Sequence, residues 1–424
     1  MPGARGAPER AQTRHARSYM PAQGAAETDP SSGKHSLAEL ARFFLRLGLT
    51  AFGGPAAHIA MMEDELVRRR KWLSREKFLD LLGASNLIPG PSSSELAIHI
   101  GYLRCGWAGL LVGGACFILP AAILVAIIAW AYARFGHLPE VSAVLYGVKP
   151  VVIAVILQAL WGLSRTAVKN VMLAVVGVGC LLLVGLGVDL VLVLFGAGAA
   201  VGLIHFVRNG GRRKEQSAGI AFAPLLNEAR ASLARIFPTA GAAGVALAPG
   251  IWPLFYVFLK IGSIVFGSGY VLLAFLRADL VAHRGWLTDS QLVDAVAVGQ
   301  VTPGPVFTTA TFIGYLLRGP MGALVATVGI FLPAFILVAA SGPLIPHLRR
   351  SATSGAFLDG VNVASLALMA VVSSQLGRSA IVDWLTAVVA IASLVLLVRF
   401  RTNSAWLVLG GAIIGIAARL MRGA

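Results

Sequence analysis

The chain has few charged residues and almost no cysteine. Only 13% of its 424 residues are charged, whereas 57% are hydrophobic and the mean hydropathy is +0.79. A water-soluble domain needs a far more polar surface than this composition supplies. The three cysteines have no metal-ligand spacing and lie in or beside apolar segments, so we interpret them as packing residues; they are Cys105, Cys116 and Cys180.

Several other signals are missing. Residues 1–36 contain no apolar core, so they are not a signal peptide and predict a disordered cytoplasmic tail. There is no nucleotide-binding glycine motif after a strand and no cluster of metal ligands. We therefore expect no catalytic residues, no metal site and no cofactor.

The sequence contains several long apolar runs. Leu110–Ala131, Val171–Leu190 and Leu190–Phe206 are each long enough, or nearly so, to cross a bilayer, which takes about 20 residues. We predict an all-α polytopic membrane protein with about 11–13 membrane segments. The net charge of +16 comes mainly from tails and loops between these runs, which indicates the positive-inside rule and not nucleic-acid binding. On that rule the N-terminus is cytoplasmic.

A broken pattern occurs twice along the chain. Phe-Gly-Gly-Pro at 52–55, Lys-Trp-Leu at 71–73, Pro-Gly-Pro at 89–91 and Gly-Tyr at 101–102 recur as Phe-Gly-Ser-Gly at 266–269, Gly-Trp-Leu at 285–287, Pro-Gly-Pro at 303–305 and Gly-Tyr at 314–315. The offset is 214 residues up to the Pro-Gly-Pro motif and 213 beyond it. Duplicated apolar halves with matched Gly/Pro breaks are typical of secondary transporters.

The repeat divides the chain into a first half at 37–206 and a second half at 251–424. A basic linker at 207–250, with room for an extra segment, joins them on the cytoplasmic side. The first-half loop Arg68–Lys71 is strongly basic, whereas its second-half counterpart keeps only Arg284. This asymmetry favours inverted repeats with discontinuous helices.

Each Pro-Gly-Pro forces a helix break, and proline at the first helical position then starts a new helix. The free N–H groups and the positive dipole end of such a start attract anions. Serine and threonine hydroxyls follow each motif, and two facing starts make a donor-rich cradle for a tetrahedral dianion. The alternative is that these hydroxyls merely cap their helices. The substrate-binding residues that we expect are Gly53, Gly54, Pro55, Asn86, Pro89, Gly90, Pro91, Ser92, Ser93, Ser94, Gly267, Ser268, Gly269, Gln300, Thr302, Pro303, Gly304, Pro305, Thr308 and Thr309.

Ionisable residues within apolar segments are candidates for charge or proton coupling. Glu95 lies one turn beyond Pro91 and is the main candidate for a coupling proton, while Lys149 could pair with it or with substrate. His58 is either a proton site or a structural hydrogen-bonding residue. Arg46 and Lys260 match at the 214 offset and either supply positive charge for the anion or extend to the interface.

These motifs resemble the chromate ion transporter family, in its long two-domain form. The likeness rests on the Phe-Gly-Gly-Pro, the two Pro-Gly-Pro motifs, the Gly-Tyr after each, and Leu-Pro at 119–120 and 332–333, and it covers nearly all of the chain after residue 36. The resemblance implies export of chromate across the bacterial inner membrane, with resistance to chromate as the result, and a link to sulfate as an isosteric dianion. The second half departs from the pattern at 267–269, so the halves need not have equal roles.

Two alternatives remain at this stage. One is a permease for sulfate or another oxyanion without a role in chromate resistance. The other is a membrane-embedded lipid-phosphate phosphatase, but Pro89–Ser94 lacks the arginine that would clamp a phosphate. The partners that we expect are chromate, with sulfate as an analogue, and the lipid bilayer; a homodimer is an open alternative to a monomer.

Overall fold

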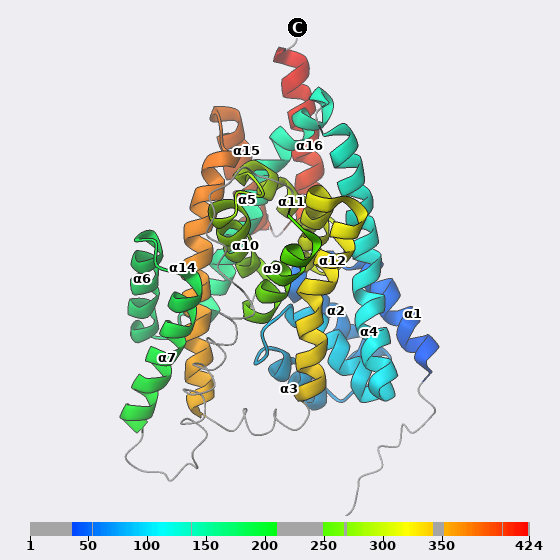
Figure 1. Ribbon diagram of the computed structural model, residues 1–424, viewed down its shortest axis with the longest axis vertical. Helices are drawn as coiled ribbons and strands as arrows, with labels where there is room; N and C mark the ends of the chain where they lie inside the picture. The colour runs from blue at the N-terminus through cyan, green and yellow to red at the C-terminus, as the bar shows by residue number, and fades with distance from the viewer. Residues whose placement is uncertain are drawn as a thin grey trace, which may run out of the picture. The chain divides into compact units, whose positions relative to one another are not determined.

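A computed structural model describes residues 36–52, 54–136, 138–209, 249–266, 269–341, 352–400 and 402–422. Every regular element in these ranges is helical, so the all-α prediction is confirmed for them (Figure 1). The expected N-terminal tail and most of the linker lie outside the described residues. So do three of the expected site residues, Gly53, Gly267 and Ser268.

The two halves contain matching helices in the same order. The elements of the first half are α1 (Leu37–Thr50), α2 (Gly54–Glu63), η1 (Asp64–Arg69), α3 (Arg75–Ser85), α4 (Ser92–Phe135), α5 (Pro139–Ala167), α6 (Val171–Gly185) and α7 (Leu190–Asn209). Those of the second half are α9 (Ile251–Ile264), η2 (Gly269–Val271), α10 (Leu272–Leu276), η3 (Arg277–His283), α11 (Asp289–Val301), η4 (Val306–Thr308), α12 (Thr309–Ser341), α14 (Ala352–Ala380), α15 (Trp384–Phe400) and α16 (Ser404–Arg422).

Helices α4 and α12 are each folded into a hairpin. The backbone leaves the helical region at Cys105 and Gly106 in α4, and Gly106 has a φ of 58°. A Cβ atom on Gly101 would meet the carbonyl of Gly109, and one on Gly113 would lie 2.9 Å from the carbonyl oxygen of Ala97, so the two arms run antiparallel. The short arm at 92–104 is about 20 Å long, which is less than the hydrocarbon thickness of about 30 Å.

The same turn recurs in α12 at Arg318 and Gly319, where Gly319 has a φ of 62°. The long arms of the two hairpins lie against each other and run in opposite directions, because Leu110 near the start of one clusters with Val338 near the end of the other (Figure 1). The ring of Tyr132, near the end of α4, meets that of Phe312 in the short arm of α12 edge-on, with the centroids 5.2 Å apart. Matching helices that run antiparallel are what an inverted repeat requires.

The later helices of the two halves are interlocked. Helix α5 of the first half packs on α15 and α16 of the second, and α14 of the second half packs on α6 and α7 of the first. Helices α5 and α14 also contact each other. Each half therefore buries its fifth-position helix (α5 or α14) against the last two helices of the other half.

Six helical segments of the described residues are long and apolar enough to cross a bilayer, by length and composition: Ser92–Phe135, Pro139–Ala167, Leu190–Arg208, Val306–Ser341, Thr353–Ala380 and Ser404–Met421. Three shorter apolar helices, α6, α9 and α15, accompany them. The chain is thus a polytopic membrane protein. The predicted 11–13 segments also counted the broken pairs, which fold as the short helices α1–α3 and α9–α11.

Candidate functional site

The Gly/Pro breaks of the two halves meet at one place. The N–H of Gly90 in the first Pro-Gly-Pro donates to the carbonyl oxygen of Val265 at 2.7 Å, where α9 of the second half ends. The N–H of Gly304 in the second Pro-Gly-Pro donates to the carbonyl oxygen of Ala51 at 2.9 Å, where α1 of the first half ends. Gly90 and Ala51 of the first half match Gly304 and Val265 of the second half at the 214 offset. Each Pro-Gly-Pro motif is therefore hydrogen-bonded to the end of the broken helix in the opposite half.

The Phe-Gly-Gly-Pro break and its counterpart also adjoin each other. A Cβ atom on Gly269 would lie 3.8 Å from the ring of Pro55, which places the first break of one half beside that of the other. Gly54 begins α2 with a φ of 80° and is buried. The described parts of all four breaks are therefore gathered into one cluster.

Glycine is required at the centre of each Pro-Gly-Pro. Gly90 and Gly304 have φ values of 142° and 90°, a region that residues with a Cβ atom rarely adopt. A Cβ on Gly304 would lie 2.6 Å from the Cβ of Ala121, and one on Gly90 would meet the carboxyl oxygen of Glu95. Gly304 thus permits close approach to the first half, whereas Gly90 leaves room for the Glu95 side chain of its own half.

A new helix begins after each motif. Pro91 is the N-cap of α4, and its carbonyl accepts from the N–H groups of Ser94 and Glu95. In the second half a 3-10 turn, η4, stands between Pro305 and α12. Residues 90–101 and 302–314 are all buried. Broken backbone at membrane depth must be enclosed by protein or line a cavity, and here it is enclosed.

The hydroxyl groups near the motifs are not equivalent. Thr308 and Thr309 each donate at 2.8 Å to a carbonyl three residues earlier, and Thr302 donates to the carbonyl of Val298 at 2.9 Å. These three hydroxyl protons are bonded to backbone carbonyl oxygens of their own segments, so they are not free to donate to an anion in this conformation. By contrast, the Oγ of Ser94 is buried and has no hydrogen-bond partner among the described residues.

Glu95 is fully buried directly behind Gly90. Neither of its carboxyl oxygens has a hydrogen-bond partner within the part of the chain that the structure describes. A buried carboxylate without a partner is strongly unfavourable in an apolar interior. Its burial without a partner makes it the candidate for proton coupling in this cluster.

His58 connects three segments of the first half. Its Nε2 lies 3.1 Å from the carbonyl oxygen of Ala51, which only accepts, so Nε2 carries the proton. Its Nδ1 lies 3.4 Å from the Oγ of Ser93 and accepts from that hydroxyl when the ring is neutral. The ring also meets that of Phe117 edge-on at 5.5 Å. These contacts favour the structural interpretation of His58.

Two of the three basic candidates pair with carboxylates, and the third is exposed. Lys149 pairs with Asp294 at 3.1 Å, not with Glu95, and it also donates to Ser290 at 2.7 Å. Lys260 donates to both carboxyl oxygens of Asp279, at 3.0 and 3.1 Å. Arg46 is exposed, in agreement with an extended side chain at the interface.

Two further candidates lie at the ends of the helices that lead into the motifs. Asn86 is exposed and caps the end of α3, whereas the Nε2 of Gln300 is buried without a partner among the described residues. Sequence reasoning left Asp294 without a role and did not consider Tyr132, which donates to it at 2.8 Å. The sequence feature that could have indicated a role for Asp294 is its match with Asp80 at the 214 offset.

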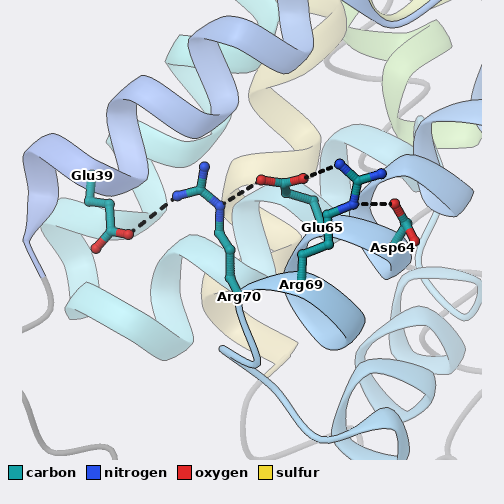
Figure 2. Close-up of polar contacts among 5 residues, drawn as sticks. All are labelled: Glu39, Asp64, Glu65, Arg69 and Arg70. Atoms are coloured by element: carbon teal, nitrogen blue, oxygen red, sulfur yellow. Dashed lines mark hydrogen bonds and ion pairs between the residues drawn. The ribbon is translucent and has the colours of Figure 1, made fainter.

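The basic loop of the first half forms a charge network away from the breaks (Figure 2). Arg69 pairs with Asp64 at 2.9 Å, and Arg70 pairs with Glu65 at 2.9 Å and with Glu39 of α1 at 3.3 Å. Since these side chains are partly exposed, each pair contributes about 0–1 kcal/mol, and their main effect is to orient the loop against α1.

Comparison with known proteins identifies the family. A sequence model of the chromate transporter family matches residues 38–203 and 252–416. The chain belongs to the chromate transporter family. It is 34% identical to the chromate transport protein of Cupriavidus metallidurans over 406 residues, which cover 94% of this chain and 96% of the relative. No solved structure matches it.

Two other relatives agree with this assignment. The probable chromate transport protein of Synechococcus elongatus is 31% identical, over 85% of this chain and 90% of the relative. The chromate transport protein of Pseudomonas aeruginosa is 31% identical, over 85% of this chain and 86% of the relative. The three relatives are named as transport proteins and not as enzymes, so the phosphatase alternative is excluded.

Proposed function

We propose that this chain exports chromate from the cytoplasm across the bacterial inner membrane and thereby confers resistance to chromate. The observation that carries the proposal is the reciprocal pair of hydrogen bonds, Gly90 to Val265 and Gly304 to Ala51. These bonds bring two helix starts, one from each half, into the same buried cluster. Helix N-termini bind anions through free N–H groups and the positive end of the dipole.

The recognition of a dianion then rests on backbone groups and a few hydroxyls. The described basic side chains near the breaks are paired elsewhere or exposed, so a full positive charge is not the basis of selectivity. Ser94 is the hydroxyl best suited to donate to the anion, because it is buried and otherwise unpartnered among the described residues. Chromate and sulfate share the tetrahedral shape and the charge that such a cradle fits.

Export is favourable on electrical grounds. With the N-terminus and the linker in the cytoplasm, an inside-negative potential drives a dianion outward by about 4.6 kcal/mol per 100 mV, twice the value for one charge. Proton antiport would add to this, and Glu95 is the group that we assign to it. Its buried carboxyl lies against Gly90, so the carboxylate form and the anion would repel each other within one site.

The test is uptake of chromate into inside-out vesicles from cells that express the chain, with and without a pH gradient. Energised uptake above that of empty vesicles would support export, and its loss on collapse of the gradient would support proton coupling. A permease for sulfate or another oxyanion is the second candidate, because the backbone cradle does not distinguish isosteric dianions. Sulfate that is transported as well as chromate, in cells without resistance, would favour that candidate.

A further inference from the structure

Two titratable side chains lie one turn apart in the buried short arm of the α4 hairpin. Glu95 and His99 are four residues apart, so they lie on the same face of the helix with their Cβ atoms about 5–6 Å apart. Helical side chains lean toward the N-terminus, so the imidazole of His99 leans toward the turn that carries Glu95. The glutamate is 0% exposed and the histidine 5%. One face of the short arm therefore holds an acid and a base side by side.

The fold gives neither side chain a structural hydrogen bond. Both carboxyl oxygens of Glu95 and the Nε2 of His99 are buried without a partner among the described residues. A buried polar group without a partner costs about 1–3 kcal/mol, so a histidine that only supports the fold is normally bonded. His58 shows that arrangement, since its ring nitrogens contact Ala51 and Ser93. His99 therefore has a role other than holding helices together.

The helices packed on α4 bring mainly apolar side chains to it. They include Phe44 and Leu47 of α1, Phe78 and Leu82 of α3, and Ala334 and Val338 of α12. The charged residues of α1 and α3 are all exposed: Glu39, Arg42, Arg46, Arg75, Glu76, Lys77 and Asp80. His58 of α2 contacts the short arm at Ser93, on the opposite side of the helix from Glu95, and Asp294 of α11 contacts α4 at Tyr132 in the long arm. These contacts leave Glu95 and His99 as each other's titratable neighbours on this face.

The same face reaches the surface at the hairpin turn. Tyr102 lies three residues further along it and is 36% exposed, and its ring meets that of Trp107 edge-on at 5.4 Å across the turn. The turn adjoins the basic loop of the first half, because the guanidinium of Arg104 lies 4.1 Å from the ring centroid of Trp72. Exposure thus rises along the face toward the loop that the positive-inside rule places in the cytoplasm.

The second half has no equivalent pair. The counterparts are Thr308 or Thr309 for Glu95 and Phe312 or Ile313 for His99, according to where the one-residue difference in offset falls. Neither a threonine nor an apolar residue takes up a proton near neutral pH. The acid and base pair therefore belongs to the first half alone, and so would a proton path built on it.

We propose that His99 is a relay residue that passes the coupling proton from Glu95 to the cytoplasmic surface beside Tyr102. This rests on the proposed function, in which Glu95 is the coupling group. A change of rotamer turns the carboxyl of Glu95 from Gly90 toward the imidazole. The O–H bond of the carboxyl then breaks and an N–H bond forms at the Nε2 of His99. The imidazolium loses the proton on its Nδ1 to water at the surface, so one proton reaches the cytoplasm and a carboxylate remains.

The relay can be tested without substrate, by infrared spectroscopy of the purified full chain. The carbonyl stretch of the protonated Glu95 carboxyl is the band that Glu95→Gln removes, and it shifts when deuterium from D₂O replaces the proton. His99→Gln keeps a polar side chain but carries no proton, so it should slow this exchange by about 100-fold, the lower end of what a positioned acid–base group contributes. Exchange at the wild-type rate would overturn the proposal, and so would the absence of the band at every pH.

Two further variants separate proton transfer from shape. His99→Phe introduces an aromatic ring of similar size, and it should slow the exchange as much as His99→Gln does. His283→Phe is the matched control, because that side chain is 66% exposed, and it should leave the exchange unchanged. Slow exchange in only one of the two His99 variants, with both monodisperse in detergent, would indicate a packing effect and overturn the relay.

The same variants are then compared in inside-out vesicles that contain a pH-sensitive dye. Chromate uptake by the wild type should draw protons out of the lumen, whereas His99→Gln should lose most of this proton movement and still respond to the membrane potential. The double variant Glu95→Gln/His99→Gln should be no weaker than either single variant, since the two groups act in series. Proton movement that persists in His99→Gln would overturn the relay. If chromate is not the substrate, uptake fails in the wild type while the difference in deuterium exchange remains, so the two failures are distinguishable.

Discussion

The centre of the second Pro-Gly-Pro offers a sharp test of the crosswise arrangement, through the variant Gly304→Ala. The φ of 90° at this residue disfavours any side chain by about 1–2 kcal/mol. The new Cβ would also lie 2.6 Å from the Cβ of Ala121 and 3.2 Å from the carbonyl oxygen of Gly48, an overpacking that costs about 1–3 kcal/mol. We therefore expect the free energy of unfolding to fall by about 2–5 kcal/mol.

The assay is unfolding in mixed micelles, followed by chromate uptake with the protein that remains folded. Ala121→Gly in the same chain removes the atom that collides with the new Cβ, so it should restore part of the stability but not the part lost to the backbone. Gly179→Ala is the matched control, because a Cβ there meets nothing within 4 Å in α6. Wild-type stability and uptake in Gly304→Ala would refute the tight contact between the halves.

Three further outcomes follow from the site and the interlocked halves. Glu95→Gln should fold normally yet lose most proton-dependent uptake, and uptake that still responds to the pH gradient would remove Glu95 from coupling. Ser94→Ala should weaken chromate uptake, whereas Thr308→Val should change it little because that hydroxyl already bonds to the carbonyl of Pro305; equal effects in the uptake assay would contradict this. A chain cut within 210–248 should recover uptake when both halves are co-expressed, and each half expressed alone should be degraded, since α5 and α14 lack their partners; a stable isolated half would count against interlocking.

The repeat, the helix breaks and the family could be predicted because they are local in the sequence. Pro-Gly-Pro within apolar sequence excludes a continuous helix, and two copies at one offset identify the halves. The fate of the charged side chains could not be predicted in the same way. Whether Lys149 meets Glu95 or Asp294 depends on which helices of opposite halves touch, and the interlocking of α5 with α11 and α16 has no signature in local sequence.

The hydroxyl groups show a second limit of sequence reasoning. Ser94 and Thr308 occupy matched positions after Pro-Gly-Pro, yet one is unpartnered among the described residues and the other bonds to its own helix. The backbone does not account for the difference, since the N–H groups of Ser94 and Thr308 both donate to the carbonyl three residues earlier. Which hydroxyls stay available for a ligand is therefore set by the side-chain conformation, and the residue type alone does not reveal it.

The reciprocal hydrogen bonds also constrain how the protein can move. Ala51 ends α1, and its carbonyl accepts from Gly304 of the opposite half while also lying 3.1 Å from the Nε2 of His58. A displacement of α2 therefore moves His58 and, through Ala51, the second Pro-Gly-Pro motif. The counterpart of His58 in the second half is Leu272, which cannot transmit force through a hydrogen bond. Movement of α2 is thus coupled to both helix starts, because His58 also lies 3.4 Å from the Oγ of Ser93 beside the first motif.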